Sequence, residues 1–180
     1  MRIKAENSAV LVIDYQERLV PVIHDNVSIV EKTVTLLKGA RALGLPFILP
    51  RQYPKGLGDI VDEVKEAVGD YTPFDKLSFS ACGETEIMEH LRSLNKKTVI
   101  VCGVEAHVCV LQSVIDLAAA GFTPVLACDC IGSRFPYDKE IALLRAQQEG
   151  ALLTTAEAIL FEMTQRAGSD TFKTISKLVK

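Results

Sequence analysis

The chain has 180 residues, 48% of them hydrophobic and 24% charged, with a net charge of −3 and no Trp. This length suits a single domain over residues 1–180 that buries a sizeable core. No basic or aromatic-plus-basic patch favours a nucleic-acid partner. Charged residues interrupt every apolar stretch before it reaches membrane-spanning length, so we expect no contact with a membrane.

The cysteine content indicates a reducing compartment. There are five cysteines, an odd number, in a chain that is not small, which argues against a disulfide framework. The N-terminus runs directly into a strand and shows no signal peptide. We therefore expect a cytoplasmic protein. Because they lie in or at the end of buried strands, Cys102 and Cys128 are expected to be inert, whereas Cys82 and Cys130 are expected to be partly accessible.

The sequence predicts neither a metal nor a cofactor. The three histidines are dispersed, and no Cys-x-x-Cys pair is present. Ser8 to Asp14 is predicted to be a buried strand with an acid at its carboxyl end. The residues that follow, Tyr15-Gln16-Glu17, are bulky where a dinucleotide fold requires glycines. Taken alone, Asp14 is best interpreted as a turn or cap residue.

A predicted helix over Val27–Leu43 and a strand over Leu45–Leu49 follow, with Pro50 ending the strand. The next segment, RQYPKGLGDI, is a loop at the carboxyl end of that strand. It is either a simple connector or, with Arg51 and Tyr53, a loop that faces substrate.

Lys76 lies in an unusually apolar segment, between Phe74, Leu77 and Phe79. A lysine is ordinarily a solvated surface residue. If its ammonium is buried, it requires an anionic partner, and Asp14 and a Cys109 thiolate are the available ones. Helices are predicted on either side of this segment, over Asp59–Val68 and Glu84–Leu94.

Thr98 to Leu111, TVIVCGVEAHVCVL, is the central stretch of the chain. Thr98–Cys102 is predicted to be a strand buried on both faces, Gly103 ends it, and a helix begins near His107. Cys109 then lies in the first helical turn, where the helix dipole favours a thiolate. The alternative interpretation is that Cys109 only fills space in the core.

The remaining elements repeat the alternation of strand and helix, which predicts a three-layer, Rossmann-like α/β domain with a mostly parallel sheet and helices on both faces. Right-handed crossovers would bring Asp14, Arg51 and Cys109 to one edge of that sheet. The predicted segments are strands over Thr123–Ala127 and Ala151–Thr154, a loop over Asp129–Tyr137, and helices over Asp138–Gln148, Thr155–Met163 and Asp170–Leu178.

Three motifs resemble the isochorismatase-like cysteine hydrolases: VLVIDYQ with Asp14, DKLSFSA with Lys76, and CGVEAHVCV with Cys109. The similarity runs in register over about residues 8–161. RQYPKGLG resembles the metal-free branch that includes YcaC-like and isochorismatase-domain-type members. Nicotinamidase-type members carry an Asp-x-His metal run there, and this chain does not.

The resemblance implies a hydrolase with an Asp-Lys-Cys catalytic triad. Cys109 would attack a carbonyl carbon of a small-molecule amide or related C–N substrate and form a thioester-type intermediate. Lys76 would keep the thiol pKa low, and Asp14 would transfer protons.

The resemblance also concerns the backbone around the triad. Backbone N–H groups of Glu105 or Ala106 and of Cys109 would form an oxyanion hole, and a cis peptide would join Val104 to Glu105. The candidates for contacting the substrate are Gln16, Arg51 and Tyr53.

Two other functions stay open at this point. One is a non-catalytic, oligomeric binding or scaffold homologue of the same fold. The other is a nucleotide-binding flavodoxin-like module, against which the missing phosphate loop counts. The resemblance also implies a homo-oligomer, with Phe172, Ile175 and Leu178 of the C-terminal helix as the expected contact.

Overall fold

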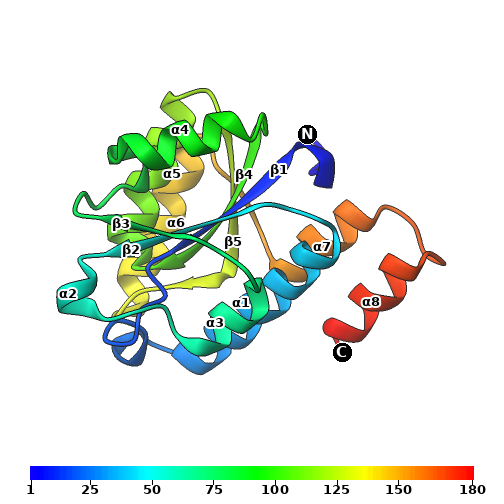
Figure 1. Ribbon diagram of the computed structural model, residues 1–180, viewed down its shortest axis with the longest axis horizontal. Coiled ribbons are helices and arrows are strands. Elements are labelled where there is room, and N and C mark those ends of the chain that lie inside the picture. The colour runs from blue at the N-terminus through cyan, green and yellow to red at the C-terminus, as the bar shows by residue number, and fades with distance from the viewer.

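The computed structural model describes all residues, Met1–Lys180, and contains one six-stranded, fully parallel sheet with the order β3-β2-β1-β4-β5-β6. The strands are β1 Ser8–Ile13, β2 Phe47–Gln52, β3 Pro73–Lys76, β4 Thr98–Val104, β5 Thr123–Gly132 and β6 Leu152–Thr154. Figure 1 shows the twisted sheet edge-on between two layers of helices. The expected three-layer α/β fold is confirmed.

The helices divide between the two faces of the sheet. On one face, α1, α3, α7 and α8 pack with the apolar side chains of the first core cluster, and on the other α4, α5 and α6 pack with those of the second (Figure 1). The α-helices are α1 Asn26–Ala42, α2 Pro54–Leu57, α3 Asp62–Val68, α4 Thr85–Ser93, α5 Leu111–Ala119, α6 Pro136–Gln148, α7 Ala156–Thr164 and α8 Asp170–Leu178. Four shorter helical turns are η1 Ala5–Asn7, η2 Val20–Val22, η3 Ala81–Gly83 and the π-helical turn η4 Ala106–Val110.

Strand β4 lies inside the sheet, between β1 and β5, and all seven of its residues are buried. It pairs with β1 from Ser8↔Thr98 to Ile13↔Gly103. The central position predicted from its β-branched apolar sequence is confirmed, because only a strand covered on both faces can keep such a run away from water.

The strand β2 does not end at Pro50, as expected, but continues to Gln52. A proline lacks only its N–H, and the Pro50 carbonyl still accepts a hydrogen bond from the Asp14 N–H at 3.4 Å. The continuation pairs with β3, a short edge strand that the sequence pattern did not predict, through Pro50↔Phe74 and Gln52↔Lys76. This pairing brings Lys76 to the carboxyl edge of the sheet.

The strand β5 is also longer than expected: it continues into the first part of the predicted loop and ends at Gly132. As a result, the expected accessibility of two cysteines is wrong: Cys130 is fully buried, whereas Cys128 is half-buried. The pairing of β5 with β4 shifts register between Leu126 and Ile131, and this irregularity places Cys130 in the same core cluster as Val125 and Ala127. All five cysteines are free thiols.

The C-terminal helix does not offer the expected contact surface. Ile175 is fully buried in the core of the same chain, and the Phe172 ring lies 6.3 Å from that of Phe161 in α7. The apolar stripe of α8 is therefore occupied by intramolecular packing.

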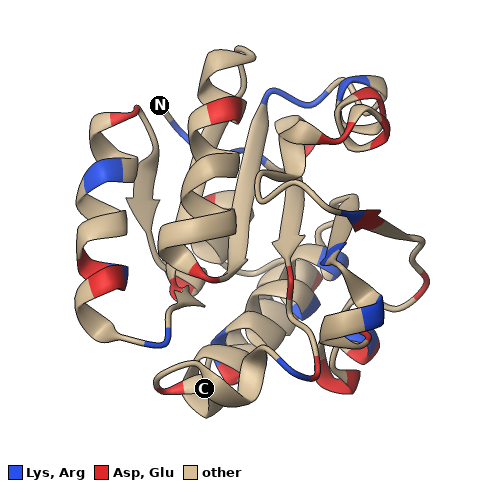
Figure 2. Cartoon of the chain, turned by 90° about the vertical axis from the view of Figure 1, so that its left-hand side faces the viewer, with Lys and Arg blue, Asp and Glu red and all other residues tan.

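The outside of the molecule is mixed in charge. Figure 2 shows Lys and Arg interspersed with Asp and Glu along the outer helices and loops, without a belt of one sign. None of the helices combines the length and the apolar character needed to cross a bilayer.

The close contact between β4 and β1 predicts that a side chain at Gly103 would destabilise the protein. A Cβ on Gly103, whose φ is +147°, would lie 2.4 Å from the Ile13 carbonyl oxygen. Gly121, with φ +86°, has no atom within 4 Å of such a Cβ. We expect Gly103→Ala to lower the free energy of unfolding by about 1–3 kcal/mol more than Gly121→Ala in urea titrations. Equal losses would show that the close approach is relieved without strain.

Candidate active site

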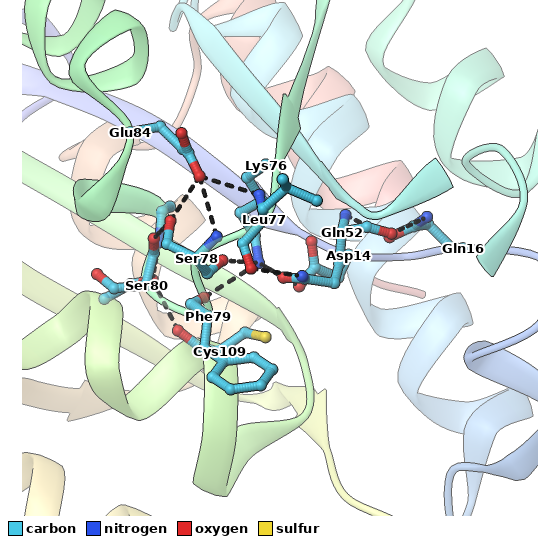
Figure 3. Close-up of polar contacts among 12 residues, drawn as sticks. Asp14, Gln16, Gln52, Lys76, Leu77, Ser78, Phe79, Ser80, Glu84 and Cys109 are labelled. Atoms are coloured by element: carbon cyan, nitrogen blue, oxygen red, sulfur yellow. Dashed lines mark hydrogen bonds and ion pairs between the residues drawn. The ribbon is translucent and has the colours of Figure 1, made fainter. Parts of the chain in front are cut away.

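The site is built around a buried ion pair at the carboxyl edge of the sheet. Asp14 follows β1 with a left-handed φ of 54°, and Lys76 is the last residue of β3. Lys76 Nζ lies 2.9 Å from Asp14 Oδ2, and both side chains are inaccessible to solvent (Figure 3). The partner that a buried Lys76 was expected to require is therefore Asp14.

Three further oxygens surround the Lys76 ammonium. Nζ donates to Gln52 Oε1 at 2.6 Å and to the carbonyl oxygens of Phe79 at 3.0 Å and Ser78 at 3.3 Å. These contacts replace the water that the ammonium loses on burial. Gln52 was missed by sequence reasoning, although its position at the end of a buried strand could have indicated it.

The loop that supplies these carbonyls is fixed by Glu84. Its Oε1 accepts hydrogen bonds from Leu77 N at 2.9 Å, Ser78 N at 3.0 Å and Ser78 Oγ at 2.7 Å (Figure 3). These bonds, that of the Ser78 hydroxyl above all, lower the pKa of Glu84, so its carboxylate is charged at neutral pH. The segment after Lys76 is thus held in one conformation.

Cys109 lies in η4, which follows β4. The peptide between Val104 and Glu105 is cis, and the Glu105 N–H donates to no protein acceptor. Ser113 connects this turn to η3, because its Oγ donates to the Cys109 carbonyl at 2.7 Å and accepts from Ala81 N at 2.8 Å. Cys109 itself is 5% exposed.

The Glu105 side chain holds the same turn from the outside. Its carboxylate accepts from Arg134 Nε, with Oε2 at 3.0 Å, and from Arg134 N at 3.0 Å. His107 is in turn connected to Ser133 Oγ, 3.0 Å from its Nδ1. The loop between β5 and α6 therefore supports the backbone that leads to Cys109. Ala106, in the same turn, is buried.

The expected lowering of the Cys109 pKa is wrong for the resting protein. Burial raises the pKa of the thiol to about 12, and the negative charge of Asp14 adds to the rise, whereas Lys76 opposes it. Proximity to the ammonium does not outweigh the loss of water. Cys109 is thus a neutral thiol at pH 7, and its deprotonation requires a base.

Asp14 has the properties of that base. Burial raises its pKa, and Lys76 and the Cys109 thiol act in the opposite direction. Apart from the ion pair, neither of its buried oxygens accepts a well-directed hydrogen bond from the protein. An oxygen is therefore available to take the thiol proton, and the raised pKa makes this carboxylate a stronger base than an exposed one.

The three substrate-contact candidates differ in availability. Gln16 is buried and bonds to the backbone of Gln52, with Nε2 3.0 Å from its carbonyl oxygen. Arg51 is held by Asp59 at 2.8 Å and Asp75 at 2.7 Å. Tyr53 is 52% exposed. Gln16 and Arg51 are thus occupied by contacts within the protein. Of the three candidates, only the Tyr53 side chain is exposed.

No group of three or more His, Cys, Asp or Glu side chains is placed to hold a metal ion. The chemistry available at this edge is that of a thiol, a carboxylate, an ammonium and backbone N–H groups.

Asp14 raises the pKa of the Cys109 thiol and Lys76 lowers it, and these opposite effects give a prediction. Asp14→Asn removes the charge that raises the Cys109 pKa, while Lys76 retains its hydrogen-bond acceptors on Gln52, Ser78 and Phe79. Alkylation of Cys109 by iodoacetamide at pH 8 should accelerate on the order of tenfold, because more thiolate is present. Lys76→Met should slow it. The rates are measured by peptide mapping across pH.

Cys82 is the internal control for that measurement. It is half-buried with a pKa also raised to about 12, but by burial and Asp116, not by Asp14. Its labelling should be unchanged in both variants. Slower labelling of Cys109 in Asp14→Asn would contradict the electrostatic assignment.

Comparison with known proteins agrees with the resemblance of the three sequence motifs around Asp14, Lys76 and Cys109. The isochorismatase domain model matches residues 8–158. The secreted isochorismatase effector Isc1 of Phytophthora sojae (strain P6497) is 34% identical over 184 residues, which cover 99% of this chain and 87% of that protein. The MAR1 ribonuclease structure from Caenorhabditis elegans has a TM-score of 0.94 at 37% identity and covers 99% of this chain and 92% of its own.

The Escherichia coli YcaC gene product, an octameric hydrolase of unknown specificity, shares the fold, with a TM-score of 0.93 at 24% identity over 99% of this chain and 89% of its own. The domain model spans most of the chain, and the similarity to Isc1 spans nearly all of it. The chain therefore belongs to the isochorismatase family.

Proposed function

We propose that this protein hydrolyses a small amide or a related C–N bond through a covalent thioester on Cys109. The observation that carries the proposal is the buried Asp14–Lys76 pair, 2.9 Å apart, beside a thiol whose pKa responds to both groups. A buried ion pair is expensive to maintain and contributes little to stability by itself. A catalytic role explains why one is placed next to Cys109.

In the first half-reaction, Cys109 Sγ attacks the carbonyl carbon as Asp14 takes the thiol proton. The carbonyl oxygen becomes an oxyanion and is stabilised by backbone N–H groups of the Glu105–Cys109 turn. Collapse breaks the C–N bond. The leaving amine takes the proton from Asp14, and the acyl group stays on Cys109 as a thioester.

In the second half-reaction, Asp14, again a carboxylate, takes a proton from water as the water oxygen attacks the thioester carbon. The C–S bond then breaks, the carboxylic acid leaves, and the thiol recovers its proton. Lys76 takes no part in these proton transfers. It stabilises the negative charge that passes between Asp14 and Cys109 and holds Asp14 in position.

The main alternative is a binding protein of the same fold without turnover. It is disfavoured because Asp14, Lys76 and Cys109 are all retained and Asp14 and Lys76 are paired. A ribonuclease activity, as in the name of the Caenorhabditis elegans structure, rests on similarity alone. Lys and Arg are interspersed with Asp and Glu in Figure 2 and the net charge is −3, which disfavours binding to an RNA backbone.

We also propose a cytoplasmic homo-oligomer. Five free thiols favour a reducing compartment, although Isc1 of Phytophthora sojae is secreted. The octameric assembly of the Escherichia coli YcaC gene product favours oligomerisation.

The central test is a panel of small amides with detection of released ammonia. A substrate should give an acyl-sized mass increase on the Cys109 peptide in acid-quenched samples. Cys109→Ala should abolish turnover because the nucleophile is lost. Asp14→Asn should lower kcat by at least about a hundredfold, since general acid–base catalysis contributes at least that factor. Cys82→Ala, the matched control, should retain activity. Turnover that survives Cys109→Ala would exclude the mechanism.

A second test concerns metals. Because no suitable side-chain cluster exists and residues 51–53 are Arg-Gln-Tyr, hydrolysis should survive dialysis against a chelator. Activity and metal content are followed together. A loss of activity that is restored by one equivalent of zinc or iron would show that a metal takes part.

A further inference from the structure

The outer face of α6 has an unusual distribution of side chains. Its core-facing positions include Ala142 and Ala146, which are buried. Its large apolar side chains face solvent instead: Tyr137 is 70% exposed, Ile141 44% and Leu144 53%. A surface helix ordinarily has the reverse arrangement. The large side chains of α6 therefore contribute little to the fold of the single chain.

The exposed residues form one continuous stripe. Positions 137, 141 and 144 recur at helical spacing, and Gln148 continues them by one more turn. Phe135, just before the helix, is 61% exposed and extends the apolar surface at that end. The apolar part of the stripe, from Tyr137 to Leu144, spans about 10 Å of this 13-residue helix. Such a contiguous apolar stripe is typical of an interaction surface.

The charges beside the stripe indicate what covers it. Asp138 and Arg145 are seven residues apart and therefore lie on the same flank, two turns from each other. When two such helices pair antiparallel about a two-fold axis, Asp138 faces Arg145 of the partner subunit, and Arg145 faces Asp138 of the partner subunit. The face is thus complementary to itself, as an isologous interface requires.

We propose that two copies of this chain pair through the outer faces of their α6 helices, antiparallel and about a two-fold axis. The proposal gives an interface to the homo-oligomer of the proposed function and does not depend on catalysis. Asp138 and Arg145 are free to form the new pairs, since their present contacts, to His107 at 3.8 Å and to Glu149 at 3.7 Å, are long and partly exposed.

Another apolar surface of the molecule fits a second copy less well. It is a cavity of about 550 Å³ beside η2 and α1, lined by Val20, Val27 and Val61. Its charged lining residues are Glu31 and Glu63, both acidic, so two copies placed face to face would repel each other.

The α6 interface would also lie next to the active site. The helix packs against η4, which carries Cys109. Five surface cavities of about 320–550 Å³ exist elsewhere on the single chain, and none is lined by Asp14, Lys76 or Cys109. Pairing at α6 places the second copy beside η4, on the flank of the sheet edge that holds Asp14, Lys76 and Cys109.

The first test is particle mass by light scattering coupled to size exclusion. Ile141→Glu with Leu144→Glu should at least halve the mass of the wild-type particle, because two charges then enter the apolar stripe. Val27→Glu, at an exposed apolar position beside the cavity near η2 and α1, is the control and should leave the mass unchanged. A monomeric wild type, or a mass that only Val27→Glu lowers, would overturn the proposal.

Charge reversal tests the antiparallel arrangement. Asp138→Arg alone and Arg145→Asp alone should each raise the dissociation constant on the order of tenfold, because like charges then face each other twice. The double variant restores both pairs and should return the constant to near its wild-type value. Failure of the double variant to recover would exclude this geometry. Since no substrate is needed, the result stands whether or not the protein proves to be a hydrolase.

Discussion

The ion pair between Asp14 and Lys76 determines how the carboxyl edge of the sheet is built. Both groups are fully buried, and a buried charge without a partner destabilises a protein by about 3–5 kcal/mol. The pair is therefore stable only while β1 and β3 hold the two residues together. Gln52, at the end of the intervening strand β2, and the carbonyls after Lys76 complete the set of oxygens around the ammonium. The loop held by Glu84 supplies two of these oxygens, the carbonyls of Ser78 and Phe79.

The same pair controls the reactivity of Cys109. In the resting protein burial dominates, and the pKa of the thiol rises to about 12. Burial also raises the pKa of all four other cysteines, so a high pKa does not distinguish Cys109. Its position beside a base and a cation does. In the proposed mechanism, Cys109 stays a neutral thiol until a substrate binds and becomes a nucleophile only when its proton moves to Asp14.

The active-site turn is supported from two sides by ordinary packing elements. Ser113 of α5 fixes the carbonyl of Cys109 from below, and Arg134, just before α6, holds Glu105 from the outside. Because α6 packs against this turn with alanines, its large side chains remain available on the opposite face. In the proposed dimer, α6 would support the turn that carries Cys109 with one face and contact the partner subunit with the other.

The sequence by itself determined the fold class, the central position of β4 and the identity of the three residues at the edge. Continuous β-branched runs can only be buried strands, and the carboxyl ends of parallel strands meet at one edge. Tertiary structure alone decided the pairing of β3 with β2, the continuation of β5 that buries Cys130, and the packing of α8 on its own chain. It also decided the Cys109 pKa, since a local motif indicates a nearby helix terminus but not how much water is removed. Edge pairing, burial and desolvation depend on contacts between residues far apart in the chain, and no local pattern records them.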